Sequence, residues 1–283
     1  MAFKAGNKIV LKGGKESLKS NLILVKLWHQ ALSENGFSKD NVVYLDLNRE
    51  EIQEAIAKNT YKADLIIPRG GDQLIDFVKK NSNIPVLISG RGNNFLYVDD
   101  EADFEMAKKI ILNGKSRISV CNALDKVIIN KNLPNLETQL LDLVQYLKEN
   151  NLYVFGFGEI LKLNSDLQKD ENPEILKEEF LSEKIVLLLG NSLEEAIEII
   201  NENSGGHSAS IITNNKIKAV KFQTEVDCGA VYHNASTRFT DGGEFGLSGE
   251  IAISTQKLHF RGPLGIHQLT TNKWFISGNG EVR

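Results

Sequence analysis

The sequence has no long hydrophobic run. Its longest unbroken aliphatic stretch, Ile185–Leu189, spans five residues, whereas a transmembrane helix needs about twenty. The first seven residues, MAFKAGN, also lack the apolar core of a signal peptide. We therefore expect a soluble, cytoplasmic protein with no membrane partner.

The sequence is also short of cysteine and has no excess of positive charge. Its two cysteines, Cys121 and Cys228, are too few for a disulfide framework and are typical of a reducing compartment. The 33 basic and 37 acidic side chains give a formal net charge of −4, which argues against nucleic acid as a partner. With 283 residues, 41% of them hydrophobic and 25% charged, the chain can bury a sizeable core beneath a soluble surface.

In the first hundred residues, short apolar runs alternate with amphipathic segments. The predicted strands cover 8–11, 42–45, 65–68 and 84–88, and the predicted helices cover 20–35, 50–58 and the stretch around Leu74 and Val78. Strands that alternate with helices in this way predict a parallel, doubly wound α/β sheet. Such sheets bind ligands beyond the carboxyl ends of their strands, where this sequence places its glycine pairs.

After Asp99 the character of the sequence changes. The predicted elements are a helix at 102–112, a strand at 127–129, helices at 136–148 and 192–201, and a glycine-rich loop at 242–249. Asn113 and Gly114 form a helix-stop signal, and Ser192 is placed as the N-cap of the last helix.

Cys121 is the first candidate for chemistry. It follows a polar loop with Lys115 and Arg117, and positive neighbours lower the pKa of a thiol toward a reactive thiolate. Considered alone, a cysteine beside an apolar strand is more often a small core residue. Cys228, before a Gly-Ala-Val run, fits that structural role better still.

Arginine is rare, and its positions are informative. Only seven of the 33 basic residues are arginines, and five of them lie in predicted loops: Arg69, Arg91, Arg117, Arg238 and Arg261. A guanidinium beside flexible backbone suits bidentate binding of carboxylate or phosphate. The alternative is that each arginine ties a loop to the body of the protein. As a group they suggest a multiply charged anionic ligand.

The turn from Lys12 to Lys15 follows a predicted strand and precedes a helix. Glycines in such a turn let backbone N–H groups approach a phosphate, and lysines add positive charge. The turn matches neither the P-loop nor the GxGxxG pattern, so it is weak evidence by itself. The five histidines show no metal-ligand spacing, and no metal is expected.

Read in order, these segments resemble the γ-glutamyl phosphate reductases (glutamate-5-semialdehyde dehydrogenases), the proline-biosynthetic branch of the aldehyde dehydrogenase superfamily. The matching stretches are GNKIVLKGGKES, DLIIPRGGDQLI, VCNALDKVII, GGHSASIIT and NASTRFTDGGEFGLSGEIAISTQKLHFRGPLGIHQLTTNKW. The last stretch, at 234–274, is highly specific to the family. The resemblance covers nearly the whole chain.

The resemblance implies an aldehyde-dehydrogenase-like α/β fold. It divides the chain into a partial dinucleotide-binding domain with an incomplete doubly wound parallel sheet (1–100), a second α/β catalytic domain (101–265) and a C-terminal segment (266–283). The last segment is expected to return to the cofactor domain or to an oligomer interface.

The resemblance also assigns roles to individual residues. Cys121 matches the catalytic nucleophile. The cofactor-binding residues are Lys12, Gly13, Gly14 and Lys15 at the adenosine end, Arg69, Gly70 and Gly71 at the pyrophosphate, and Glu179 at the nicotinamide ribose. The substrate-binding residues are Arg238, Thr240, Asp241 and Arg261. Lys15 is compatible with the 2′-phosphate of NADP.

The implied reaction is the NADPH-dependent reduction of an acyl phosphate through a thioester on Cys121. Its small anionic substrate is γ-glutamyl phosphate, and its product is glutamate 5-semialdehyde. Two alternatives are a catalytically inactive remnant that only binds a ligand or partner, and a related aldehyde dehydrogenase that acts on another acyl substrate.

The sequence begins about a third of the way into the chains it resembles. By the resemblance, the absent part holds a central strand of the cofactor domain and an asparagine that stabilises the oxyanion. Unpaired strand edges are costly, so we expect a separate N-terminal chain or a homo-oligomer to complete the protein.

Overall fold

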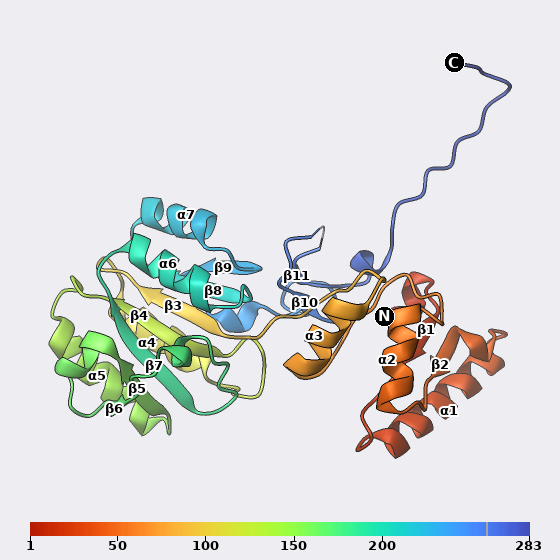
Figure 1. Ribbon diagram of the computed structural model, residues 1–283. Helices are drawn as coiled ribbons and strands as arrows, with labels where there is room; N and C mark the ends of the chain where they lie inside the picture. The colour runs from red at the N-terminus through yellow and green to blue at the C-terminus, as the bar shows by residue number, and fades with distance from the viewer. Residues whose placement is uncertain (259) are drawn as a thin grey trace.

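The computed structural model describes residues 1–258 and 260–283, without the side chain of Asp72. His259, one of the histidines in the metal-site argument, therefore lies outside the described residues. The chain forms a smaller N-terminal unit and a larger α/β unit, with the last residues extending away from both (Figure 1).

The smaller unit is built on one pair of parallel strands. β1 (Ile9–Leu11) pairs with β2 (Val42–Tyr44), and Ile9 lies opposite Val42. The helices of this unit are α1 (Leu18–Glu34), α2 (Arg49–Lys58) and α3 (Asp72–Asn81), with short 3-10 helices η1 (Phe3–Ala5) and η2 (Lys39–Asn41). The parallel strands agree with the doubly wound pattern of the sequence.

Two of the predicted strands are not extended strands in the structure. The runs at 65–68 and 84–88 meet only in one isolated parallel bridge, between Ile66 and Val86. A strand needs a ladder of hydrogen bonds to a neighbouring strand. Each of these runs has one partner among the described residues, and pairing is limited to that single position.

The larger unit contains a seven-stranded sheet whose neighbours are all parallel. The strands, in chain order, are β3 (Asn94–Val98), β4 (Leu124–Asn130), β5 (Tyr153–Phe157), β6 (Gln168–Lys169), β7 (Lys184–Gly190), β8 (Ser208–Ile212) and β9 (Ala230–His233). Their spatial order is β6-β5-β7-β4-β3-β8-β9. This sheet begins at Asn94, and every residue of β3 is buried within it.

Helices cover both faces of this sheet (Figure 1). They are α4 (Phe104–Gly114), α5 (Leu136–Glu149), α6 (Leu193–Asn203) and α7 (Lys216–Glu225). As predicted, Ser192 caps α6, and its side chain accepts a hydrogen bond from the Glu195 backbone. The remaining elements are η3 (Gly158–Lys162), η4 (Pro173–Leu176), η5 (Thr237–Phe239), η6 (His267–Leu269) and an antiparallel pair, β10 (Ile253–Ser254) with β11 (Gly262–Pro263).

Alternation along the strands produces two separate cores. Leu96 and Val98 of β3 pack with residues of α4 and α5, whereas Phe95 and Tyr97 of the same strand pack with residues of α6 and α7. Successive side chains of a strand point to opposite faces. A parallel sheet covered on both faces therefore needs continuous apolar strands, as β3 and β7 have.

A third, smaller core joins the two units. Leu87 packs with Ala252 and Leu264 beside the β10–β11 pair. The Ile88 backbone donates a hydrogen bond to Gln256 at 2.7 Å, and Ser89 bridges to Ser254. The chain segment that precedes the large sheet is therefore held by residues near the C-terminus.

A hydrogen bond links the C-terminal segment to the smaller unit. The side-chain amide of Asn7 donates to the Leu269 carbonyl at 2.8 Å. Beyond residue 270 the chain has no regular secondary structure, and Trp274 is 87% exposed. In the described part of the chain, no helix combines the length and apolar character that a membrane span requires.

We expect Ile129→Ala to lower the free energy of unfolding by about 2–5 kcal/mol, because Ile129 is fully buried in the larger core and alanine leaves a cavity. Urea unfolding measures the change. Leu141→Ala, on the exposed side of α5, is the matched control and should change stability by less than about 0.5 kcal/mol. Equal losses from both variants would contradict this description of the core.

Candidate active site

The parallel sheet brings three separate segments to one edge. Asn94 is the first residue of β3, Cys121 lies three residues before β4, and His207 immediately precedes β8. Because β4, β3 and β8 are neighbours and run in the same direction, their amino ends meet at that edge. Cys121 therefore lies beside residues that are far from it in the sequence.

Backbone packing at Cys121 leaves no room for a side chain at Gly92. A Cβ atom built on Gly92 would lie 1.9 Å from the Cys121 carbonyl oxygen and 2.5 Å from its Cα. Both contacts involve backbone, which cannot move aside as a flexible side chain can. The glycine is therefore required by close approach between the two segments.

The charges around Cys121 differ from the sequence expectation. Burial raises the pKa of the Cys121 thiol, the carboxylates of Glu250 and Glu179 raise it further, and the positive charge of Arg69 opposes them. Lys115, which the sequence suggests as an activating neighbour, instead forms a buried ion pair with Asp125 at 2.6 Å. The thiol is thus held in its neutral form, and the explanation by Lys115 is wrong.

Glu179 is held by a set of buried charged side chains. Asp125 accepts hydrogen bonds from Lys115 and from the Phe180 backbone, and Lys126 donates to the Glu178 carbonyl. The ammonium of Lys126 also lies 3.9 Å from the centre of the Phe180 ring. Burial lowers the pKa of Lys126 to about 7. These contacts fix the backbone on both sides of Glu179.

Glu179 itself faces the Cys121 segment. Burial raises the pKa of its carboxyl group, and a hydrogen bond from the Gly92 backbone opposes that rise. The structure therefore brings Cys121, Glu179 and Arg69 together, three residues that the sequence analysis named for chemistry or cofactor binding.

The predicted adenosine-end turn lies in the smaller unit beside a cavity of about 450 Å³. Lys12, Gly14 and Lys15 line it after β1, and Asp46 and Asn48 line it after β2. The cavity is therefore at the carboxyl ends of parallel strands, where the sequence predicts a ligand. Gly13 lies in the same turn, and Gly71 is the N-cap of α3, directly after Arg69 and Gly70.

The predicted substrate residues divide into two groups. The first borders Cys121: Arg238 donates to the Asn122 side chain, and Thr240 is fully buried with its hydroxyl 2.7 Å from Ser208 Oγ. Asp241 follows and accepts a hydrogen bond from the backbone N–H of Gly243 in the glycine-rich loop.

Arg261 forms the second group. Its guanidinium contacts Asp227, with Nη1 2.7 Å from Oδ1 and Nη2 2.9 Å from the carbonyl oxygen. In this structure the charge of Arg261 is therefore directed to an internal carboxylate.

Several residues at the site were missed by sequence reasoning. They are Gly92, Asn94, Asn122, His207 and Glu250. Glu250 ends the glycine-rich loop, and burial raises the pKa of its carboxyl group. Its position in a stretch highly specific to the family was a usable signal. The polar residues at the start of β3 gave no sequence signal of a site, because asparagine is common at the end of an apolar strand.

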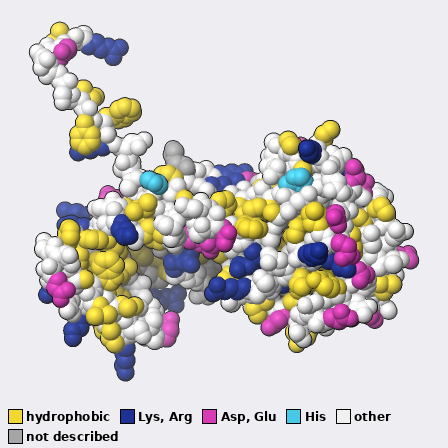
Figure 2. Space-filling model, turned by 180° about the vertical axis from the view of Figure 1, so that it is seen from behind, with side chains coloured by type: hydrophobic (Ala, Val, Ile, Leu, Met, Phe, Trp, Pro, Cys, Tyr) yellow, Lys and Arg dark blue, Asp and Glu magenta, His cyan; other side chains and the backbone are white. Residues whose placement is uncertain are grey.

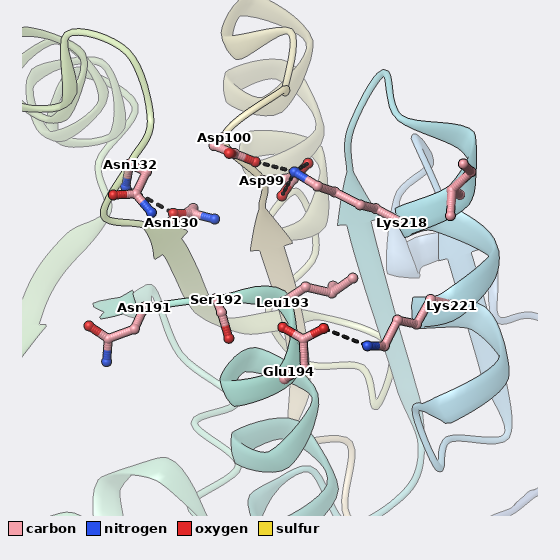
Figure 3. Close-up of a pocket in the computed structure, with 11 residues that line it drawn as sticks. Asp99, Asp100, Asn130, Asn132, Asn191, Ser192, Leu193, Glu194, Lys218 and Lys221 are labelled. Atoms are coloured by element: carbon pink, nitrogen blue, oxygen red, sulfur yellow. Dashed lines mark hydrogen bonds and ion pairs between the residues drawn. The ribbon is translucent and has the colours of Figure 1, made fainter.

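A second cavity, of about 270 Å³, lies at the opposite edge of the large sheet (Figure 3). Lys221 pairs with Glu194 at 2.5 Å, and Lys218 pairs with Asp99 and Asp100. The ammonium of Lys218 thus lies among acidic groups that would otherwise suit a cation. Because Lys218 already pairs with Asp99, Asp100 and Glu101, and Lys221 pairs with Glu194, we assign no site to this cavity.

Comparison with known proteins agrees with this architecture. The aldehyde dehydrogenase family model matches residues 1–151 and 167–274. The chain therefore belongs to the aldehyde dehydrogenase family. Within that family, it is a homologue of the γ-glutamyl phosphate reductases, as the following relatives show.

The γ-glutamyl phosphate reductase of Clostridium botulinum (strain Eklund 17B / Type B) is 43% identical over 284 residues, covering 100% of this chain and 68% of the relative. The corresponding protein of Dictyoglomus thermophilum is 44% identical over 287 residues, with the same coverage. The crystal structure of the Thermotoga maritima γ-glutamyl phosphate reductase superposes with a TM-score of 0.94 at 38% identity, over 100% of this chain and 68% of that one. The chain thus spans about two thirds of the length of these relatives.

We expect Glu250→Gln to lower the pKa of Cys121, because it removes a negative charge that disfavours the thiolate. Only the thiolate reacts with iodoacetamide, so the reaction rate should begin to rise at a lower pH than in the parent protein. Mass spectrometry distinguishes Cys121 from Cys228, whose pKa burial raises to about 11. Glu244→Gln, in the same loop, is the control, and an unchanged profile in Glu250→Gln would contradict the assignment.

Proposed function

We propose that this chain carries the nucleophile and the ligand-binding surfaces of an NADPH-dependent γ-glutamyl phosphate reductase. The observation that carries the proposal is the grouping of Cys121 with Glu179, Glu250 and Arg69 at one edge of the sheet, in a chain 43% identical to such reductases. Arg69 places a positive charge near the thiol, which suits the anionic pyrophosphate of a cofactor bound beside it.

The cavity beside the Lys12–Lys15 turn suits the adenosine end of NADPH. It is concave, lies at the carboxyl ends of β1 and β2, and carries the ammonium groups of Lys12 and Lys15. Glu51 also lines it, but its carboxylate is engaged in the capping box of α2. Lys15 is the residue that we assign to the 2′-phosphate. Glu179 is assigned to the nicotinamide ribose, and Arg69, Gly70 and Gly71 to the pyrophosphate.

Cys121 acts first as the nucleophile and later as the leaving group. The Sγ–H proton leaves first, and Glu250 is the carboxylate that we assign to take it, since its Oε2 is buried with no hydrogen-bond partner among the described residues. The thiolate then attacks the acyl carbon, the carbon–oxygen bond to phosphate breaks, and a thioester remains. When bound, NADPH supplies the hydride that converts the thioester to the aldehyde. The carbon–sulfur bond breaks, and Cys121 returns as the thiolate.

Arg238 and Asp241 border Cys121 and are proposed to face the substrate, whereas Thr240 is fully buried and is proposed to act by holding their loop. Thr240 contributes through its buried hydroxyl, which fixes the loop, and Arg238 presents a cation next to Asn122. Of the four predicted substrate-binding residues, Arg261 has the weakest case for contact with the substrate, because its guanidinium is paired with Asp227.

The reverse reaction tests this proposal. Purified protein is mixed with glutamate 5-semialdehyde, phosphate and NADP⁺, and NADPH formation is followed by absorbance. We expect turnover that falls by at least about 10³-fold in Cys121→Ala, because the covalent step is lost. Cys228→Ala is the matched control and should retain activity. Turnover that persists in Cys121→Ala would overturn the role of Cys121.

A binding remnant without catalysis is the second candidate. The specific observation in its favour is the small unit, whose extended strands form one two-stranded sheet among the described residues. Such a pair is marginal without further strands or a covering layer. If NADPH binds but no turnover occurs, the chain is a binding protein without catalytic activity.

The smaller unit exposes several large apolar side chains on α1 and β1. On α1, Ile23, Leu24 and Leu27 are 62%, 57% and 56% exposed, and Val10 and Leu11 of β1 are also exposed. Figure 2 shows hydrophobic side chains gathered on this unit. Contiguous exposed apolar surface marks an interaction site. We propose that it is covered by a polypeptide equivalent to the third of the relatives that this chain does not span.

That segment of the Clostridium botulinum relative, supplied as a separate polypeptide, should bind and stabilise this chain. At a hundredfold excess over Kd, we expect Tm to rise by about 5–10 °C. Leu27→Lys should weaken the effect, whereas Leu141→Lys on α5 should not. Self-association that buries the same face, seen by light scattering without the segment, would instead identify a second copy as the occupant.

A further inference from the structure

The side-chain amide of Asn94 lies beneath the Cys121 segment. Its nitrogen is 2.8 Å from the Cys121 carbonyl oxygen, 2.7 Å from that of Ala123 and 3.0 Å from that of Gly92. Asn94 is fully buried. The two hydrogens of this one amide group are therefore shared among three carbonyls that surround the candidate nucleophile.

His207 contacts the oxygen of the Asn94 side-chain amide. Its Nδ1 lies 3.1 Å from Asn94 Oδ1. An amide oxygen only accepts hydrogen bonds, so this contact is a hydrogen bond when the imidazole hydrogen is on Nδ1, which also lies 2.8 Å from Ser208 Oγ. With Oδ1 facing the imidazole, the Asn94 nitrogen must face the three carbonyls. Reversal of the amide would direct its oxygen at them, with no donor for any.

The protonation state of His207 is fixed by its surroundings. It is fully buried, and burial lowers its pKa to about 4. Its Nε2 has no hydrogen-bond partner among the described residues. His207 is therefore neutral at physiological pH, and its orienting effect does not vary with pH near neutrality.

The close contact at Gly92 transmits this arrangement to Glu179. The Gly92 carbonyl accepts from Asn94, while its N–H donates to the Glu179 carboxylate. The Gly92 backbone also packs directly against Cys121. A shift of Asn94 would therefore change the position of Cys121 relative to Glu179.

The same network continues to the other side of Cys121. Ser208 Oγ lies 2.8 Å from His207 Nδ1 and 2.7 Å from Thr240 Oγ1. The Thr240 carbonyl accepts from the side chain of Asn122, the residue after Cys121, at 2.9 Å. Cys121 is thus held between two buried asparagines that His207, Ser208 and Thr240 connect.

We propose that Asn94 is a positioning residue for Cys121, and that His207 orients it by donating a hydrogen bond from Nδ1. Neither side chain needs to touch the substrate. The proposal rests on the proposed function only in taking Cys121 as the reactive thiol.

The test compares His207→Leu with His207→Asn, because asparagine keeps a donor near the position of Nδ1 and leucine does not. The readout is the rate of alkylation of Cys121 by iodoacetamide from pH 6 to 10, with Cys228 as an internal reference for unfolding and Tm measured in parallel. In His207→Leu, we expect alkylation of Cys121 at neutral pH to change by about tenfold or more. His207→Asn should restore the parent profile, and Cys228 should stay unreactive in both.

Asn94→Leu is a second route to the same result and should reproduce the profile of His207→Leu. Equal Cys121 profiles in the parent and both leucine variants, with only Tm reduced, would overturn the proposal. Because alkylation needs no substrate, a changed profile in a chain without reductase activity would support the positioning role while refuting the proposed function. In an active chain, the leucine variants should lose kcat with little change in KM for NADPH.

Discussion

The position of β3 inside a parallel sheet is the constraint on which the site depends. Its neighbours β4 and β8 run in the same direction, so the starts of all three strands meet at one edge. Asn94, Cys121 and His207 lie at that edge, although they are up to 113 residues apart in the chain. Without this register, the three carbonyls beside Cys121 would have no common donor.

Burial then determines the chemistry of the groups at this edge. It keeps the Cys121 thiol and His207 in their neutral forms and leaves Lys126 with a pKa of about 7. Buried polar groups are tolerated only when they are hydrogen-bonded, and leaving one unpaired costs about 1–3 kcal/mol. The dense bonding among Asn94, Asn122 and their partners follows from that cost. It also makes the geometry around Cys121 stiff.

In the smaller unit, the sequence pattern predicted some strands correctly and others wrongly. Alternating apolar runs correctly predicted β1, α1, β2 and α2, because these depend on local pattern and on near neighbours. The same patterns predicted full strands at 65–68 and 84–88, where the structure has one bridge. An apolar run signals a tendency to form a strand, but the strand forms only where a partner supplies its hydrogen bonds.

The sequence by itself determined the α/β class, the parallel sheet, the cap at Ser192 and the candidates Cys121, Glu179 and Arg69, because these follow from local pattern and from stretches that resemble a known family. It also placed the turn from Lys12 to Lys15 after a strand, and both lysines line a cavity in the structure. Only the tertiary structure decided that Lys115 is paired with Asp125, that Glu250 acts on the thiol, and that Asn94 and His207 lie under Cys121. The reason is physical: pairing, burial and pKa depend on which groups are close in space, and that distance is set by strand order in the sheet.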